Sequence, residues 1–183
     1  NIRVDVFLEE LPDSFSMFSV MEEVSHEVKE IKIYDLFIAL DCADSTRLGF
    51  SYELYNQASK TLCVDHHISN SGYADENYIV PEASSTAELV YRLLDKESID
   101  KDIAECLYLG IVHDTGVFQY SNTAPKTLQV AANLIQFGFD FSKIIEETFY
   151  EKTYVQNLIL GRAVMESVLF LGGKCVYSVV NKD

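Results

Sequence analysis

The chain has 183 residues, which is enough for one domain with a full hydrophobic core, or for one domain and a small part of another. Its net charge of −15, from 29 acidic and 14 basic residues, argues against binding along duplex nucleic acid, whose affinity comes mainly from Lys and Arg. The composition is 48% hydrophobic, yet no apolar run approaches the roughly 20 residues that span a bilayer, so we expect no membrane partner.

The order of the expected elements follows from the apolar patterns and the turn residues. Strands are expected at residues 2–8, 36–40, 62–64, 78–80 and 174–180. Helices are expected at residues 16–28, 47–58, 85–95, 103–112, 125–137, 141–149 and 154–169, with a short extended piece at 117–120. Strands that alternate with helices predict an α/β fold, with a mostly parallel sheet flanked by helices on both faces. The last strand, at 174–180, has no evident partner and would be the first strand of another domain.

The four cysteines are widely spaced and form no C-x-x-C pair. Three of Cys42, Cys63, Cys106 and Cys175 lie in apolar stretches. We interpret them as reduced, buried small side chains of a cytoplasmic protein, and we expect no zinc site from them.

The apolar run that ends at Val64 is followed directly by Asp65, His66 and His67. Open α/β sheets place their sites at the carboxyl ends of strands, where these side chains would lie. Imidazole beside carboxylate, without thiolate, suits a first-row divalent metal such as Mn²⁺ better than structural Zn²⁺. The alternative is that Asp65 caps a turn and the two histidines are surface residues.

Two further acids favour the metal site. Asp41 directly follows the buried strand at 36–40, and Asp114 ends the apolar segment at 103–112. If the strands before Asp41 and Asp65 are parallel neighbours, their carboxylates meet at one sheet edge. Carboxylates crowded in this way repel one another and need divalent cations between them. Two ions roughly 3.5–4 Å apart can share a bridging carboxylate and activate a water for attack on phosphorus.

Together these segments resemble the DHH phosphoesterase family, in particular its branch of oligoribonucleases and 3′-phosphoadenosine-5′-phosphate phosphatases. The motifs occur in the family's order, and the resemblance covers nearly the whole chain. They are Asp41-Cys42-Ala43-Asp44 with Arg47-Leu48-Gly49, Asp65-His66-His67 with Ser69-Asn70, Ser84-Ser85-Thr86-Ala87-Glu88, and Gly110 to Phe118 (GIVHDTGVF).

The resemblance implies a role for each matching residue. Asp41 would bridge two Mn²⁺ ions, for which Mg²⁺ or Co²⁺ could substitute, and His66 and Asp114 would be further metal ligands. His67 would contact the scissile phosphate or protonate the leaving oxygen, and Asp65 would orient a histidine. The residues that would hold substrate or fix loops are Arg47, Asn70, Ser84, Ser85 and Thr86. For Ser85, simple capping of the helix that starts there is the stronger expectation.

The resemblance also sets the expected domain limits. Residues 1–150 would be the DHH-type catalytic domain, 151–171 a linker helix, and 172–183 the start of a C-terminal substrate-binding domain. The family's first motif, a strand that ends in a His and two Asp ligands, would precede Asn1. We therefore expect the chain to be a piece of the enzyme that is itself inactive.

The implied activity is metal-dependent hydrolysis of short oligoribonucleotides, of 3′-phosphoadenosine-5′-phosphate, or of both. Within the enzyme class, a cyclic dinucleotide phosphodiesterase and an inorganic pyrophosphatase are the alternatives. The alternative of another class is a non-catalytic nucleotide-sensing module. The expected partner is a small nucleotide or short oligonucleotide, and a homodimer is compatible with these expectations.

Overall fold

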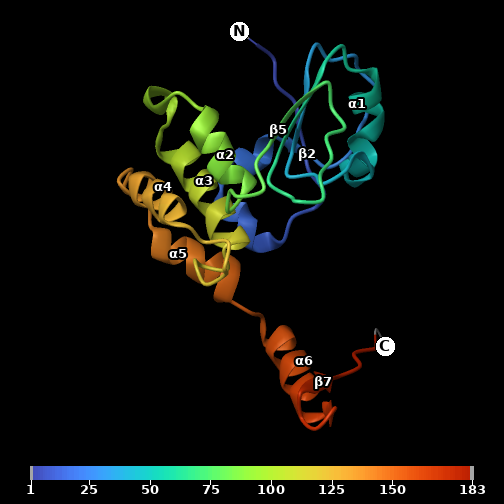
Figure 1. The fold of residues 1–183 in the computed structure, drawn as a ribbon, viewed down its shortest axis with the longest axis vertical. Coiled ribbons are helices and arrows are strands. Elements are labelled where there is room, and N and C mark those ends of the chain that lie inside the picture. Colours follow the sequence, from blue (N-terminus) through green and yellow to red (C-terminus); the bar gives the residue numbers. More distant parts are fainter. Residues whose placement is uncertain (1, 182–183) are drawn as a thin grey trace. The chain divides into compact units, whose positions relative to one another are not determined.

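The computed structural model describes residues 2–181, which form two units (Figure 1). The first unit ends at Phe149 and the second begins at Tyr150. All the residues that the sequence predicts for the site lie in the first unit.

A parallel three-stranded sheet organises the first unit, as the sequence predicts. The strands β3 (Phe37–Leu40), β4 (Thr61–Asp65) and β5 (Glu76–Ile79) lie in the order β3-β4-β5. Leu40 pairs with Val64, so β3 and β4 end at the same level. This register brings the residues that follow the two strands to one edge of the sheet.

Helices cover the sheet on both faces, which confirms the expected architecture (Figure 1). Side chains alternate between the faces of a strand. On one face Phe37 packs edge-on against Tyr55 of α1 (Tyr52–Gln57), with ring centroids 5.6 Å apart. On the other face Val64 belongs to a buried cluster with Leu89 of α2 (Thr86–Leu93).

The main hydrophobic core lies among the helices. It is built around α3 (Lys101–Asp114), which packs between α2 and α4 (Pro125–Ile135). Fully buried α3 side chains include Ala104 and Ile111. The helix α5 (Phe141–Ile145) adds Ile144 to the same core and continues as a single π turn (η5, Glu146–Tyr150). This core fixes the C-terminal end of α3, where Asp114 lies.

The N-terminal segment differs from its prediction. The strand expected at 2–8 is reduced to β1 (Val6–Phe7), which pairs in parallel with β2 (Val24–Ser25). The helix expected at 16–28 is replaced by two 3₁₀ helices, η1 (Asp13–Met17) and η2 (Ser19–Glu23). The segment contains Ser14, Ser16 and Ser19, and serine is a residue type that disfavours the interior of an α-helix.

Two other elements were predicted in the wrong form. The helix expected at 47–58 begins as the 3₁₀ helix η3 (Ser45–Ser51), because Gly49 leaves helical geometry with φ +53° before α1 starts. A short 3₁₀ helix, η4 (Lys96–Ser98), follows α2.

The piece at 117–120 is a tight turn instead of an extended segment. Val117 and Phe118 have φ of +56° and +63°, and the Thr115 hydroxyl accepts the Phe118 N–H at 3.0 Å.

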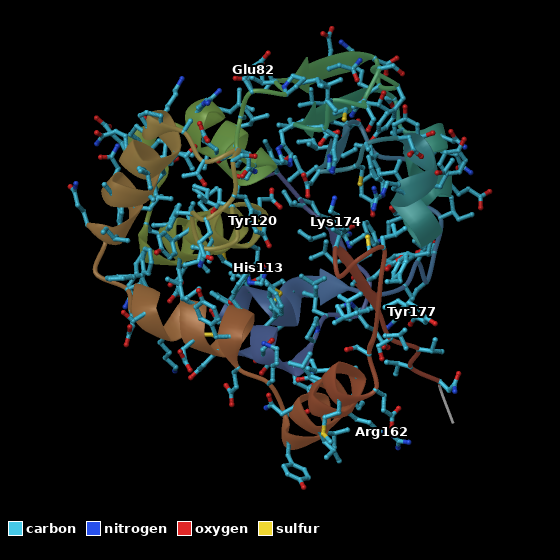
Figure 2. The ribbon with its side chains drawn as sticks, turned by 60° about the horizontal axis from the view of Figure 1, so that its bottom comes forward. Glu82, His113, Tyr120, Arg162, Lys174 and Tyr177 are labelled. Carbon is cyan, nitrogen blue, oxygen red and sulfur yellow. The ribbon has the colours of Figure 1, made fainter. Side chains whose placement is uncertain are left out.

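In the same turn, Gly116 cannot be replaced without a clash. Its φ is +55°, and a Cβ there would overlap the ring of Tyr120, which Figure 2 labels. The turn therefore depends on a glycine at this position.

The second unit is a helix followed by a hairpin. The helix α6 (Tyr154–Met165) ends four residues before its predicted limit, and β6 (Val168–Phe170) then pairs antiparallel with β7 (Cys175–Tyr177). The expectation that the last strand lacks a partner is therefore wrong. Lys174 lies in the turn before β7, as Figure 2 shows. Among residues 2–181, no helix is both long and apolar enough to cross a membrane.

A buried carboxylate ties α2 to α4. Glu88 is 1% exposed, and its Oε2 accepts hydrogen bonds from Ser84 Oγ at 2.7 Å and Thr127 Oγ1 at 3.0 Å. Arg92, one turn along α2, donates to Oε1. Burial by itself would raise the pKa of Glu88, but the hydrogen bonds from Ser84, Arg92 and Thr127 outweigh it and lower the pKa.

We predict that Glu88→Gln lowers the free energy of unfolding at pH 7 by about 2–3 kcal/mol, because the amide removes the buried charge and puts an NH2 donor where one of the two acceptor oxygens was. Since folding lowers the pKa of Glu88, the wild type should lose this contribution as the pH falls from the ordinary value of 4.5 through the lower folded value. Urea unfolding of both proteins between pH 7 and pH 3 should show the two stabilities converging. Glu82→Gln, at an exposed site that Figure 2 labels, should change little. Parallel pH profiles for wild type and Glu88→Gln would contradict the prediction.

Candidate metal centre

Asp41 sits directly after β3 in a backbone conformation that few residues adopt. Its φ is +60°, and its N–H donates to the Val64 carbonyl at 3.1 Å. Aspartate tolerates this left-handed region better than most residues, though such conformations cost on the order of 1–3 kcal/mol. The side chain is 47% exposed, and its Oδ1 accepts the Thr86 hydroxyl at 2.7 Å. The carboxylate therefore faces the N-terminus of α2 from the edge of the sheet.

Asp65 ends β4 with its side chain fully buried and surrounded by donors. Its Oδ1 accepts the His66 N–H at 2.8 Å and His67 Nδ1 at 2.7 Å. Its Oδ2 accepts Asn70 Nδ2 at 2.6 Å. Burial alone would raise the pKa of Asp65, but the hydrogen bonds, led by those from Asn70 and His67, lower it. The Asp65 carboxylate thus contacts the His67 ring directly, which is compatible with the predicted role of orienting a histidine.

His66 turns one ring nitrogen toward the protein and the other toward two acids. Its Nδ1 lies 3.2 Å from the Ala83 carbonyl, which makes Nδ1 the donor and leaves the Nε2 lone pair available to a metal ion. Nε2 lies 3.5 Å from Asp41 Oδ1 and 3.4 Å from Asp114 Oδ2. Atoms at this spacing can share one ion at about 2.1 Å from each.

Asp114 joins the group from the helical side. Burial at the end of α3, and then the negative charge of Asp41, raise its pKa, while His66 acts in the opposite direction. Asn122 Nδ2 donates to the backbone carbonyls of Asp114 at 3.1 Å and of Ser84 at 2.9 Å. Sequence reasoning missed Asn122, because a single Asn in a polar loop carries no periodic signal.

The donor atoms fit a divalent cation. One ligand atom each from Asp41, His66 and His67 lies within 4.8 Å of the others. Asp114 extends this group through its contact with His66 Nε2. The donors are carboxylate oxygen and imidazole nitrogen without thiolate, a set that suits a divalent first-row metal. The structure thus brings Asp41, Asp65, His66, His67 and Asp114 together, while their individual roles stay predictions.

The residues predicted to hold substrate lie in different surroundings. Arg47 is exposed on η3. Asn70 is 9% exposed and donates to Asp65 and to the Cys42 carbonyl, which favours the fixing of a loop. Ser84 donates to Glu88, and the Ser85 hydroxyl caps α2 by accepting the Glu88 N–H at 3.0 Å. Contact of these side chains with substrate stays a prediction.

Comparisons with known proteins agree on one family. A model described as "DHH family, N-terminal domain" matches residues 3–111. The chain is 33% identical over 150 residues to the bifunctional oligoribonuclease and PAP phosphatase NrnA of Bacillus subtilis, covering 79% of this chain and 46% of that protein. It is 37% identical over 95 residues to the cyclic-di-AMP phosphodiesterase PdeA of Listeria monocytogenes, covering 48% of this chain and 14% of that one.

The fold is similar to that of an exopolyphosphatase-related protein from Bacteroides fragilis, with a TM-score of 0.82 and 21% identity over 91% of this chain and 53% of that chain. The chain spans about half the length of the NrnA proteins that it matches. The family model matches more than half of the chain, and the motifs around Asp41, Asp65 and His66 fall within the matched residues. The chain therefore belongs to the DHH family.

Proposed function

We propose that the protein is a metal-dependent phosphoesterase that hydrolyses short oligoribonucleotides, 3′-phosphoadenosine-5′-phosphate, or both. One observation carries the proposal: His66 Nε2 faces the carboxylates of Asp41 and Asp114 at 3.5 and 3.4 Å, in a chain of the DHH family. The similarity to a relative named for both activities supports this pair of substrates.

Four free cysteines support a reducing, cytoplasmic location.

The proposed roles are those that the resemblance to the DHH family implies, and the geometry of the side chains supports them. Asp41, His66 and Asp114 would hold Mn²⁺, and a pair of such ions would activate a water molecule and supply a positive field for the phosphate. Asp65 holds His67 by its Nδ1, so the His67 Nε2 remains to contact the phosphate or to give a proton to the leaving oxygen. The His67 side chain is 35% exposed, which leaves it accessible to substrate.

The alternative functions differ from the proposed one in the substrate that is bound or hydrolysed. A cyclic dinucleotide phosphodiesterase is supported by the similarity to PdeA, and an inorganic pyrophosphatase would use the same metal ligands on a smaller anion. A non-catalytic nucleotide sensor would bind nucleotide and turn over none of these substrates.

The decisive experiment uses the protein as its gene encodes it, with Mn²⁺. Initial rates are measured on a short RNA, 3′-phosphoadenosine-5′-phosphate, cyclic di-AMP and pyrophosphate. We expect the highest kcat/KM on one of the first two. Preference for cyclic di-AMP or pyrophosphate would replace the proposed substrates, and nucleotide binding without any turnover would favour the sensor.

We predict that Asp41→Ala abolishes turnover and Mn²⁺ binding while the fold stays intact, because the proposed bridging ligand is lost. Isothermal titration with Mn²⁺ and the rate assay check this, with circular dichroism for the fold. Asp44→Ala is the matched control: Asp44 follows in the same motif, is exposed and caps η3 by accepting the Thr46 N–H at 2.9 Å. Retained activity in Asp41→Ala would remove Asp41 from the mechanism.

We predict that His67→Ala lowers kcat by about 100-fold or more, as expected for loss of a general acid, while Mn²⁺ still binds. The same titration and rate assay measure both quantities. Loss of Mn²⁺ together with rate would instead make His67 a metal ligand, which its position beside Asp41 and His66 also allows.

A further inference from the structure

A hydroxyl from the helical layer reaches the carboxylate that follows β3. Thr86, the first residue of α2, is 4% exposed, and its Oγ1 donates to Asp41 Oδ1 at 2.7 Å. We propose that Thr86 is a positioning residue that sets the orientation of the Asp41 carboxylate for metal binding. This inference rests on the proposed function, since it takes the Asp41 site to be a metal site.

The Asp41 carboxylate needs such a partner. Rotation about the bond that carries a carboxylate is broad and weakly restrained, and the side chain is 47% exposed. The Thr86 bond falls on Oδ1, the oxygen that lies 3.5 Å from His66 Nε2 and 3.9 Å from His67 Nδ1. A carboxylate oxygen has two lone pairs, so Oδ1 can accept the hydroxyl and still bind an ion. The bond therefore keeps Oδ1 turned toward the histidines.

Thr86 is itself rigidly held. Its β-branched side chain restricts rotation at χ1. The turn before it is anchored from two sides, since Ser84 Oγ donates to the buried Glu88 at 2.7 Å and Asn122 donates to the Ser84 carbonyl at 2.9 Å. Contacts within the helical layer therefore help to hold the Thr86 hydroxyl in place beside Asp41.

A direct contact between Thr86 and substrate fits the structure less well. At 4% exposure the side chain has almost no surface to offer a phosphate. Its only hydrogen points at Asp41, because a hydroxyl donates one bond. The predicted role of Thr86 in substrate binding and the proposed positioning role lead to different expected effects of a Thr86 substitution on KM and on the affinity for Mn²⁺.

The test compares Thr86→Val, which keeps the shape of the side chain and removes the donor, with Thr86→Ser, which keeps the donor. The protein as its gene encodes it is titrated with Mn²⁺. The electron paramagnetic resonance signal of free Mn²⁺ gives the affinity of each variant. Partners that orient a metal ligand typically contribute about 10–100-fold in affinity, so we expect a loss of this size in Thr86→Val and near wild-type binding in Thr86→Ser.

Thr127→Val is the matched control. Thr127 is also buried, and its hydroxyl also donates to a carboxylate, that of Glu88 at 3.0 Å. We expect this variant to lower the midpoint of thermal unfolding without changing the affinity for Mn²⁺. An equal loss of affinity in Thr127→Val would overturn the inference, because a general loosening of α2 would then explain the effect.

The remaining outcomes each decide a separate point. Wild-type protein that binds no Mn²⁺ would overturn the proposed function, and this inference with it. Wild-type binding that Thr86→Val retains would overturn this inference alone. A higher KM with unchanged Mn²⁺ affinity would assign Thr86 to substrate. If Thr86→Val does not fold, Thr86→Ala replaces it, and affinity equal to that of Thr86→Ser would overturn the inference.

Discussion

The register between β3 and β4 is the constraint on which the site depends. Leu40 pairs with Val64, so Asp41 and Asp65 emerge at the same edge of a parallel sheet. A shift of one residue would turn every side chain of a strand to the opposite face. The buried Val64 and Leu89 on one face, and the packing of Phe37 on Tyr55 on the other, specify the register through burial. The position of the acids is thus a consequence of hydrophobic packing.

Around this edge, the acids are held by two different means. Asp65 is fully buried, and hydrogen bonds from the side chains of Asn70 and His67 and from nearby backbone N–H groups lower its pKa. Asp114 is in a different environment, because burial and the negative charge of Asp41 raise its pKa. The first arrangement suits a residue that orients a histidine, and the second suits a carboxylate that a cation would neutralise.

Much of the fold was predictable from local patterns. Continuous apolar runs identified β3 and β4, and the Ser85 cap with Glu88 three residues later identified the start of α2. The meeting of Asp41 with Asp65 followed from parallel pairing. The helix expected at 154–169 extended too far because residues 168–170 are as apolar as the helix before them, and only pairing with β7 makes them a strand.

The missed features depend on contacts that are distant in sequence. Thr86 and Asp41 are 45 residues apart, and the two carbonyls that bind Asn122 come from separate elements. Contacts between residues so distant in sequence leave no pattern in residue spacing that a sequence analysis could detect. The turn at Val117 and Phe118 runs against local preference, since positive φ is unfavourable for both, and the Thr115 hydroxyl stabilises it. The limits of the linker and the C-terminal domain, and the roles of the site residues, stay predictions.

The hydrogen bond between Thr86 and Asp41 joins the sheet layer to the helical layer at the point where a ligand would bind. Linkage is reciprocal: if the docking of α2 on the sheet favours occupancy at Asp41, occupancy must favour the docking of α2 by the same free energy. The strength of the packing between the two layers would then depend on the concentration of the cation in solution. The first unit would be more rigid when the cation is bound than when it is absent.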